Sequence, residues 1–191
     1  MSPPLTRCSW AVSDLMARYH DEEWGIPCHD DDRLFEMLSL EGAQAGLSWE
    51  TVLKKREGYR QEYHGFRIAR VAEMTPDDVE RILQNPGVIR HRGKLESVVS
   101  NAKAVIEIQR EYGSLSTYLW SFVGNAPIVN RESALASTPE SDAMSKALKK
   151  RGFKFVGSTI VYAFMQACGM ADDHSPDCFR AKEQMGVRRK A

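Results

Sequence analysis

The stretch TPDDVERILQNPGVIRHRGKLESVVSNAKAVI, residues 75–106, predicts two helices joined by a short connection. Thr75 can cap the first helix, Pro76 takes its first position and Asp78 its third, a combination typical of helix starts. Apolar residues then recur at the spacing of one helical face on both sides of the connection. The segment therefore predicts an αα pair.

The connection, residues 85–94, has features of a site for a DNA backbone. A tight, glycine-containing turn exposes backbone N–H groups, and the N-terminus of the helix that begins near Lys94 favours a phosphate. Basic side chains add positive charge. The alternative is an ordinary link between helices with a charged rim. The candidate DNA-binding residues are Gly87, Arg90, His91, Arg92, Gly93 and Lys94.

The rest of the chain repeats the helical periodicity and lacks the alternating pattern typical of strands. Apolar stripes cover residues 95–106, 144–148 and 160–168, and the last two are followed by Gly152 and Gly169. No linker, internal repeat or low-complexity block interrupts them. With 191 residues, 42% of them apolar, the chain is expected to form one all-α domain.

Composition excludes several classes of protein. Lysine and arginine total 26, as do aspartate and glutamate, so the net charge is zero. No stretch approaches the roughly 18 uninterrupted apolar residues of a membrane helix. Residues 1–7 lack the apolar core of a signal peptide, and four cysteines do not make a disulfide framework. We therefore expect a cytosolic protein with reduced thiols and no membrane partner.

Four candidate metal ligands lie near the two ends of the chain. Cys8 and His20 are close to the N-terminus, whereas His174 and Cys178 are spaced so that a helix would place both on one face. Two histidines and two thiolates can form a closed tetrahedral zinc site, which is structural because no position is left for water. Spacing alone, however, favours four unrelated residues.

A carboxylate falls on an apolar helical face. Residues 30–32 are three aspartates that predict a helix start, and Glu41 then shares the face of Leu34 and Leu38. A buried carboxylate costs several kcal/mol unless it is paired or waits for a ligand, so a local arginine or backbone partner is the alternative. Nearby aromatic rings would suit a flat, cationic ligand. They are Trp10, Tyr19, Trp24 and Trp49.

Long motifs along the chain resemble those of the type I bacterial DNA-3-methyladenine glycosylases. The resemblance runs from about Cys8 to Cys178, which is nearly the whole chain. The motifs are CxW at residues 8–10, YHDxEWG at 19–25, LEGxQAGLSW at 40–49, IRHRGK at 89–94, KALKKRGFKFVG at 146–157 and FMQACG at 164–169.

The resemblance implies one helix-hairpin-helix glycosylase domain over residues 1–179. Residues 180–191 are basic and follow the matched motifs, so we expect them to form a mobile tail. It implies a monomeric enzyme of the bacterial cytoplasm, at the nucleoid, which takes double-stranded DNA containing alkylated adenine and releases free 3-methyladenine. It also implies that one structural zinc ion joins the N- and C-terminal segments. The implied ligands are Cys8, His20, His174 and Cys178.

The resemblance assigns roles around the methylated base. Glu41 and Tyr19 would hydrogen-bond the base, and Trp49 would stack on it. Trp10 and Trp24 would complete the pocket. Glu41 is the candidate catalytic residue, through recognition, strain on the glycosidic bond or polarisation of water.

The expected chemistry needs little acid catalysis. Alkylation at N3 makes adenine a cation within the nucleotide, so its glycosidic bond is already weak and the base leaves neutral. The enzyme must flip the nucleotide, bind the base and admit water. Consistently, no aspartate lies between Asp78 and Asp142, in the helices after the connection where many related glycosylases have one.

No recognised motif supplies a lysine nucleophile, so we expect a monofunctional glycosylase without a strand-cleaving lyase step. Two other functions compete with this one. A catalytically silent module that binds alkylated DNA is disfavoured by the intact set of Glu41, Tyr19 and Trp49. A zinc hydrolase is disfavoured because four protein ligands would leave the metal no open position.

Overall fold

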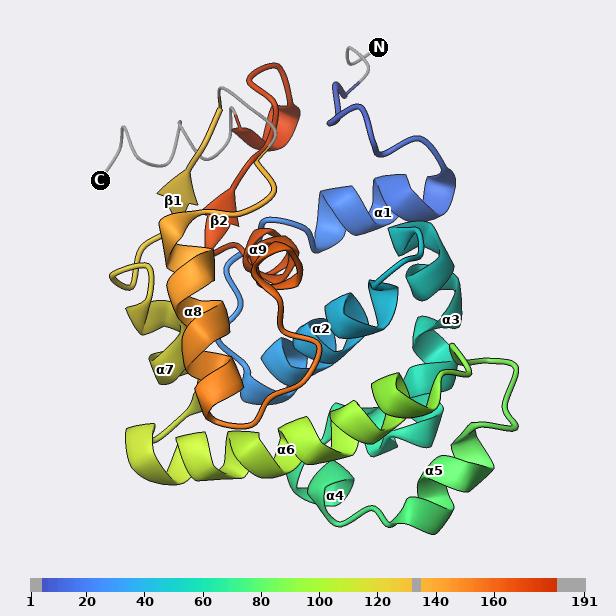
Figure 1. Ribbon diagram of the computed structural model, residues 1–191. Helices are drawn as coiled ribbons and strands as arrows, with labels where there is room; N and C mark the ends of the chain where they lie inside the picture. The colour runs from blue at the N-terminus through green and yellow to red at the C-terminus, as the bar shows by residue number, and fades with distance from the viewer. Residues whose placement is uncertain (1–4, 132–134, 182–191) are drawn as a thin grey trace.

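The computed structural model describes residues 5–131 and 135–181 (Figure 1). Within these ranges the chain forms α1 (Asp14–Glu22), α2 (Asp31–Gln44), α3 (Trp49–Glu62), the 3-10 helix η1 (His64–Phe66), α4 (Ile68–Ala72), α5 (Pro76–Ile82), α6 (Arg92–Tyr112), α7 (Leu115–Ser121), β1 (Ile128–Val129), α8 (Pro139–Lys150), α9 (Ser158–Ala167) and β2 (Ala171–Asp172). None of the described helices is both long and apolar enough to cross a membrane.

The helices begin and end where local chemistry predicts. At the start of α5 the Thr75 hydroxyl accepts from the Asp78 amide and the Asp78 carboxylate accepts from the Thr75 amide, which forms a capping box. α6 is capped by His91 and runs for 21 residues. After α8, Gly152 takes a φ of +87°, a left-handed conformation that glycine adopts without strain. The mostly helical fold is confirmed.

One small parallel sheet departs from the all-α prediction. In β1 and β2, Ile128 pairs with Ala171 and Val129 with Asp172. Each strand has two residues, too few for an alternating pattern to appear in the sequence. The pairing brings the segment before residue 132 beside the segment that leads to His174.

α2 is the central helix, surrounded by α3, α6, α7 and α9 (Figure 1). Because neighbours cover it on all sides, α2 is buried continuously from Leu34 to Ala43 rather than along one stripe. Glu41 is part of this buried stretch, and only 4% of its surface is exposed. The packing of α2 therefore decides the environment of this carboxylate.

The two ends of the described chain meet beside α1. The Phe179 amide donates to the Thr6 carbonyl at 2.9 Å. The Arg180 guanidinium donates to the Asp21 carbonyl, and Ala181 is fully buried. Both residues were expected in the tail but belong to this contact, and the remainder of the expected tail, residues 182–191, lies outside the described residues.

α3 and the α5–α6 connection approach each other at two glycines. A Cβ on Gly58 would lie 2.3 Å from the Gly87 carbonyl oxygen, far inside contact distance. Beside it, the Lys55 ammonium donates to the Pro86 carbonyl at 2.6 Å, and the Ile89 amide donates to the Tyr59 hydroxyl at 3.3 Å. The connection is therefore anchored directly on α3.

We expect Gly58→Ala to destabilise the protein by about 2 kcal/mol, because the two backbones must separate to admit the methyl group. Helix propensity alone would make this variant more stable than the wild type, since alanine in a helix interior is favoured over glycine by about 1 kcal/mol. Urea unfolding of both proteins measures the difference. A variant as stable as the wild type would contradict the close approach.

Candidate active site

A cavity of about 590 Å³ opens between α1, the C-terminal half of α2, α9 and the segment that follows β2. All five residues that the sequence suggests for a pocket line it, so the structure brings together side chains from four separate segments. They are Trp10, Tyr19, Trp24, Glu41 and Trp49.

The rings in this cavity meet mostly at steep angles. The centroids of Trp10 and Trp24 are 5.0 Å apart with planes at 74°, and those of Tyr19 and Trp49 are 5.5 Å apart with planes at 51°. Rings that do not stack on one another keep faces available for a further flat group.

Glu41 has neither an arginine nor a backbone donor among the described residues. The nearby buried Glu36 is different, because Arg56 and Arg60 donate to it at 2.6 and 2.8 Å. Burial alone raises the pKa of Glu41 to about 8, so its carboxyl group is largely protonated at neutral pH. The structure thus rules out the paired carboxylate that the sequence left as the alternative.

Other buried polar atoms on residues that line the cavity also have no partner within the described chain. Beside Glu41, they include the Tyr19 hydroxyl and the Trp49 indole N–H. Burial raises the pKa of Tyr19 well above its usual value, and the neighbouring Glu41 adds to this effect. Buried polar groups are almost always hydrogen-bonded, so unsatisfied groups on three residues around one cavity indicate a site that waits for a ligand.

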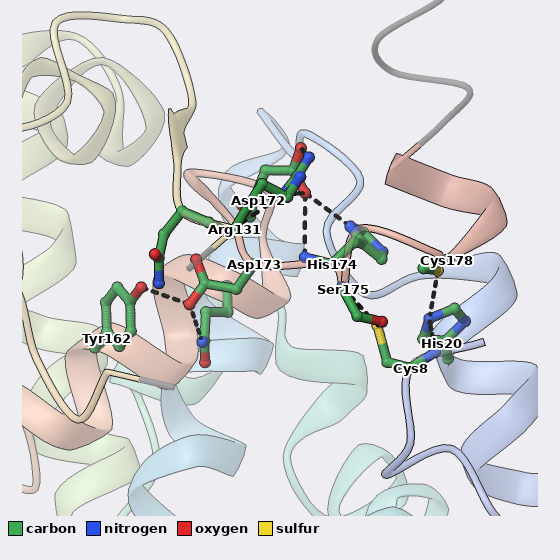
Figure 2. Close-up of polar contacts among 11 residues, drawn as sticks. Cys8, His20, Arg131, Tyr162, Asp172, Asp173, His174, Ser175 and Cys178 are labelled. Carbon is green, nitrogen blue, oxygen red and sulfur yellow. Dashed lines mark hydrogen bonds and ion pairs between the residues drawn. The ribbon is translucent and has the colours of Figure 1, made fainter. Parts of the chain in front are cut away.

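Part of the opposite wall is missed by the sequence analysis. The Asp173 carboxylate accepts from the Tyr162 hydroxyl at 2.5 Å and from the Gln166 side chain at 2.7 Å (Figure 2). Asp173, Gln166 and the neighbouring Arg131 also line the cavity. Gln166 is a polar residue within the apolar stripe of α9, which was the available signal, whereas Arg131 reaches the cavity only because β1 pairs with β2.

Three of the four candidate metal ligands converge. One ligand atom from each of Cys8, His20 and Cys178 lies within 4.8 Å of the others. His174 is adjacent, its ring centroid 5.4 Å from that of His20, and its Nε2 atom is buried without a partner in the described structure (Figure 2). The cluster joins residues from both ends of the chain.

Each histidine is oriented by a carboxylate at its other nitrogen. Nδ1 of His20 lies 2.8 Å from Asp21. Nδ1 of His174 lies 2.8 Å from Asp172 (Figure 2). Burial opposes the charge on Asp172, but hydrogen bonds from His174 and Arg131 prevail and lower its pKa to about 2. Such carboxylate–histidine pairs leave Nε2 as the ligating atom.

Cys8 is prepared for the thiolate form. Burial alone would raise its pKa, but hydrogen bonds from His20 and from the Ser175 amide and hydroxyl outweigh burial and lower the pKa to about 7. The thiolate is the form in which cysteine binds a metal.

The spacing of His174 and Cys178 would place both on one face of a helix, but no helix carries them. Residues 173–178 form an irregular turn in which the Cys178 amide donates to the Ser175 carbonyl at 2.9 Å. Pro176 explains this, because the residue before a proline is biased away from helical geometry. The turn, rather than a helix face, directs both side chains toward Cys8 and His20.

In the α5–α6 connection, backbone amides that were expected to be exposed already have acceptors within the protein. The Gly87 amide donates to the Asn85 side chain at 2.7 Å and the Val88 amide to the Asn85 carbonyl at 3.4 Å. Together with the bond from Ile89 to Tyr59, these contacts use the amides that the tight turn was expected to expose. Donors for a phosphate are left at the first turn of α6, where the backbone amides of Arg92 and Gly93 have no intrahelical acceptor.

The basic side chains of the connection are not equivalent. Arg90 and His91 are exposed. Arg92 is exposed but forms ion pairs with Glu80 and Glu96. Lys94 is 9% exposed, and its ammonium donates to the carbonyls of Ala43 and Ala45 at 2.9 and 2.6 Å. Lys94 thus faces inward, which corrects its assignment to the DNA-binding set.

The sequence analysis also missed the turn between α2 and α3. Gly46 takes a φ of +79°, and the next residue, Leu47, has 42% of its surface exposed. The turn lies between Gln44 and Trp49, which both line the cavity. An exposed leucine therefore stands next to the cavity.

Comparison with known proteins shows which family the chain resembles. A family model described as methyladenine glycosylase matches residues 10–181. The chain is 51% identical over 179 residues to the DNA-3-methyladenine glycosylase 1 of Escherichia coli strain K12, covering 91% of this chain and 96% of that protein. It is 51% identical over 178 residues to the DNA-3-methyladenine glycosylase of Haemophilus influenzae, with the same coverage of both chains.

A solved structure shares the fold. It is that of the 3-methyladenine DNA glycosylase I of Staphylococcus aureus, described as giving the structural basis of 3-methyladenine recognition. The two chains are 36% identical, with a TM-score of 0.88 over 93% of this chain and 97% of that one.

Proposed function

The chain belongs to the methyladenine glycosylase family, and on this basis we propose that it removes N3-methyladenine from alkylated DNA in base-excision repair. The observation that carries the proposal is Glu41, a carboxyl group buried among aromatic rings without a partner in the described structure. No described residue pairs with this costly group, whereas a methylated adenine ring would satisfy it.

The cavity provides each contact that a flipped base needs. The Trp49 ring offers a stacking surface and attracts the positive charge of the methylated nucleotide. The Tyr19 hydroxyl and Glu41 supply hydrogen bonds to the edge of the base. A cationic ligand lowers the pKa of a neighbouring carboxyl group, so substrate favours the ionised form of Glu41.

Hydrolysis follows from the charge of the lesion. The bond between the sugar C1′ atom and N9 breaks, and its electron pair neutralises the departing base. A water oxygen bonds to C1′ and loses a proton, which leaves an abasic site. No lysine lines the cavity among the described residues, which supports a monofunctional enzyme without a lyase step.

We also propose that Cys8, His20, His174 and Cys178 bind one structural zinc ion. The proposal is supported by the convergence of three ligand atoms, by the unpartnered Nε2 of His174 and by the two carboxylates behind the histidines. When bound, the ion supplies a link between the chain ends. Four protein ligands would leave no site for water, which disfavours a zinc hydrolase.

We infer that α5, the connection and α6 act as a helix-hairpin-helix motif on double-stranded DNA. Arg90, His91 and the start of α6 would contact phosphates, while Leu47 would occupy the space left by the flipped nucleotide. One chain supplies all these parts, so we expect a monomer that acts on the DNA of the bacterial nucleoid.

Base release from methylated duplex DNA tests the function. We expect free 3-methyladenine to appear in the supernatant and the DNA strand to remain intact until alkali is added. Binding of methylated DNA without release would instead support a catalytically silent module. Release that stops at once on addition of a chelator, while the fold persists, would support a catalytic metal.

Replacing each of the two exposed arginines, Arg90 and Arg92, should change the salt dependence of DNA binding to a different extent. Each lost phosphate contact lowers the slope of log affinity against log salt by about one, so Arg90→Ala should show this change. Arg92→Ala should change the slope less, because Glu80 and Glu96 already offset its charge. Titration of an undamaged duplex at several salt concentrations measures both, and equal effects would contradict the distinction.

A further inference from the structure

Lys94 is a buried cation whose ammonium contacts only backbone oxygens among the described residues. It lies in the first turn of α6, at the end of the connection of residues 85–94, which we call the hairpin. Its ammonium donates to the carbonyls of Ala43 and Ala45 at the end of α2. Burial lowers its pKa, and no carboxylate offsets that cost. A buried lysine without an acidic partner is rare and costly, so its position calls for a reason.

The two acceptors of Lys94 lie at the C-terminal end of α2, between Glu41 and the exposed Leu47. Ala45 is the C-terminal cap of α2, and Gly46 and Leu47 follow it directly. In the other direction, Glu41 lies one helical turn before Ala45. The Lys94 ammonium therefore holds the point at which the base-binding helix becomes the Leu47 turn.

The hairpin is anchored on α3. Lys55 and Tyr59 of α3 bind the hairpin backbone, and the Gly58–Gly87 approach leaves no space between the two segments. A shift of the hairpin relative to α2 must therefore break the bonds of Lys94 or move the Leu47 turn with it.

We propose that Lys94 is a positioning residue that fixes the Leu47 turn, and with it the mouth of the base pocket, relative to the DNA-bound hairpin. Phosphate binding by the hairpin then places Leu47 against the base stack at the position where the lesion must leave it. This inference rests on the proposed glycosylase function. It assigns Lys94 to nucleotide flipping, and neither to phosphate binding nor to contact with the base.

Binding to two duplexes separates these roles. One is undamaged, and the other contains a single tetrahydrofuran abasic-site analogue, whose gap Leu47 can fill. The wild type should prefer the second. Lys94→Met should lose most of this preference, keep the salt slope on undamaged DNA and bind free 3-methyladenine as before. Single-turnover release from methylated duplex should fall about tenfold or more, as expected when reacting groups are misplaced.

A second variant reaches the same link without touching Lys94, in case Lys94→Met does not fold. Gly46→Ala strains a left-handed residue whose Cβ would meet nothing within 4 Å, and it should lower the abasic preference too. Gly65→Ala is the matched control, because Gly65 has a φ of +65° and equally open space but lies in η1. This control should lose stability while keeping the abasic preference.

Several results would overturn the proposal. A salt slope lowered by one in Lys94→Met would make Lys94 a phosphate contact, and weaker binding of the free base would place its effect in the pocket. Unchanged abasic preference and release in folded Lys94→Met, or a wild type without the preference, would remove the positioning role. Failure of the wild type to release base would instead refute the proposed function.

Discussion

Glu41→Gln protein should fold and bind DNA but release 3-methyladenine at least about a hundredfold more slowly, a loss comparable to removing one preorganised hydrogen-bonding group from an active site. The substitution keeps the shape of the side chain and removes the negative charge that substrate induces. Single-turnover release from methylated duplex, with circular dichroism and zinc content as checks, measures the effect. Release near the wild-type rate would show that the charge of Glu41 does not recognise the lesion.

The same substitution should increase stability above pH 5. The pKa of Glu41 is about 8 in the folded protein and near its usual value of 4.5 when unfolded. The folded state therefore binds more protons between these values, and the contribution of Glu41 to stability falls as pH rises, by about 1.4 kcal/mol for each pKa unit of difference. Below pH 4.5 both states are protonated and the loss disappears.

Denaturant unfolding of both proteins at pH 5 and pH 8 measures this linkage. Glu41→Gln should exceed the wild type by several kcal/mol more at pH 8 than at pH 5. Taking the difference between the two proteins cancels the titration of the other groups. A stability difference that does not change with pH would contradict the buried, unpaired state of Glu41.

Cys8→Ser should destabilise the protein by about 3 kcal/mol or more, because the binding energy of a structural zinc ion is folding energy. Stability should fall more than affinity for the free base, although Cys8 also borders the cavity. Zinc analysis should give one ion per wild-type chain. Thermal unfolding with and without a chelator then measures its contribution.

Cys28→Ser is the matched control for the zinc prediction. Cys28 is half-buried and lies outside the converging set of ligands, so its substitution should leave zinc content unchanged. Carefully purified wild-type protein without zinc, or a chelator that leaves the unfolding temperature unchanged, would refute the proposed site.

Local patterns in the sequence determined the helices and most of the residues that line the pocket. Thr75 with Asp78 set the start of α5, and the apolar stripe of α6 appeared from its periodicity alone. Helical periodicity placed Glu41 on an apolar face, and motif resemblance assigned it and the nearby aromatic residues to one base pocket. The structure brings them to one cavity. These features depend on residues a few positions apart or on long motifs, both of which a single sequence displays.

Only the tertiary structure decided which polar groups have partners. Glu36 and Glu41 lie on the same buried helix, yet arginines of α3 reach only Glu36. Lys94 looks like a hairpin cation in the sequence, but the end of α2, about fifty residues earlier, supplies acceptors for its ammonium. Periodicity shows which face of a helix is apolar but not which segment packs there. The charge state of Glu41 and the direction of Lys94 therefore follow from contacts between distant parts of the chain.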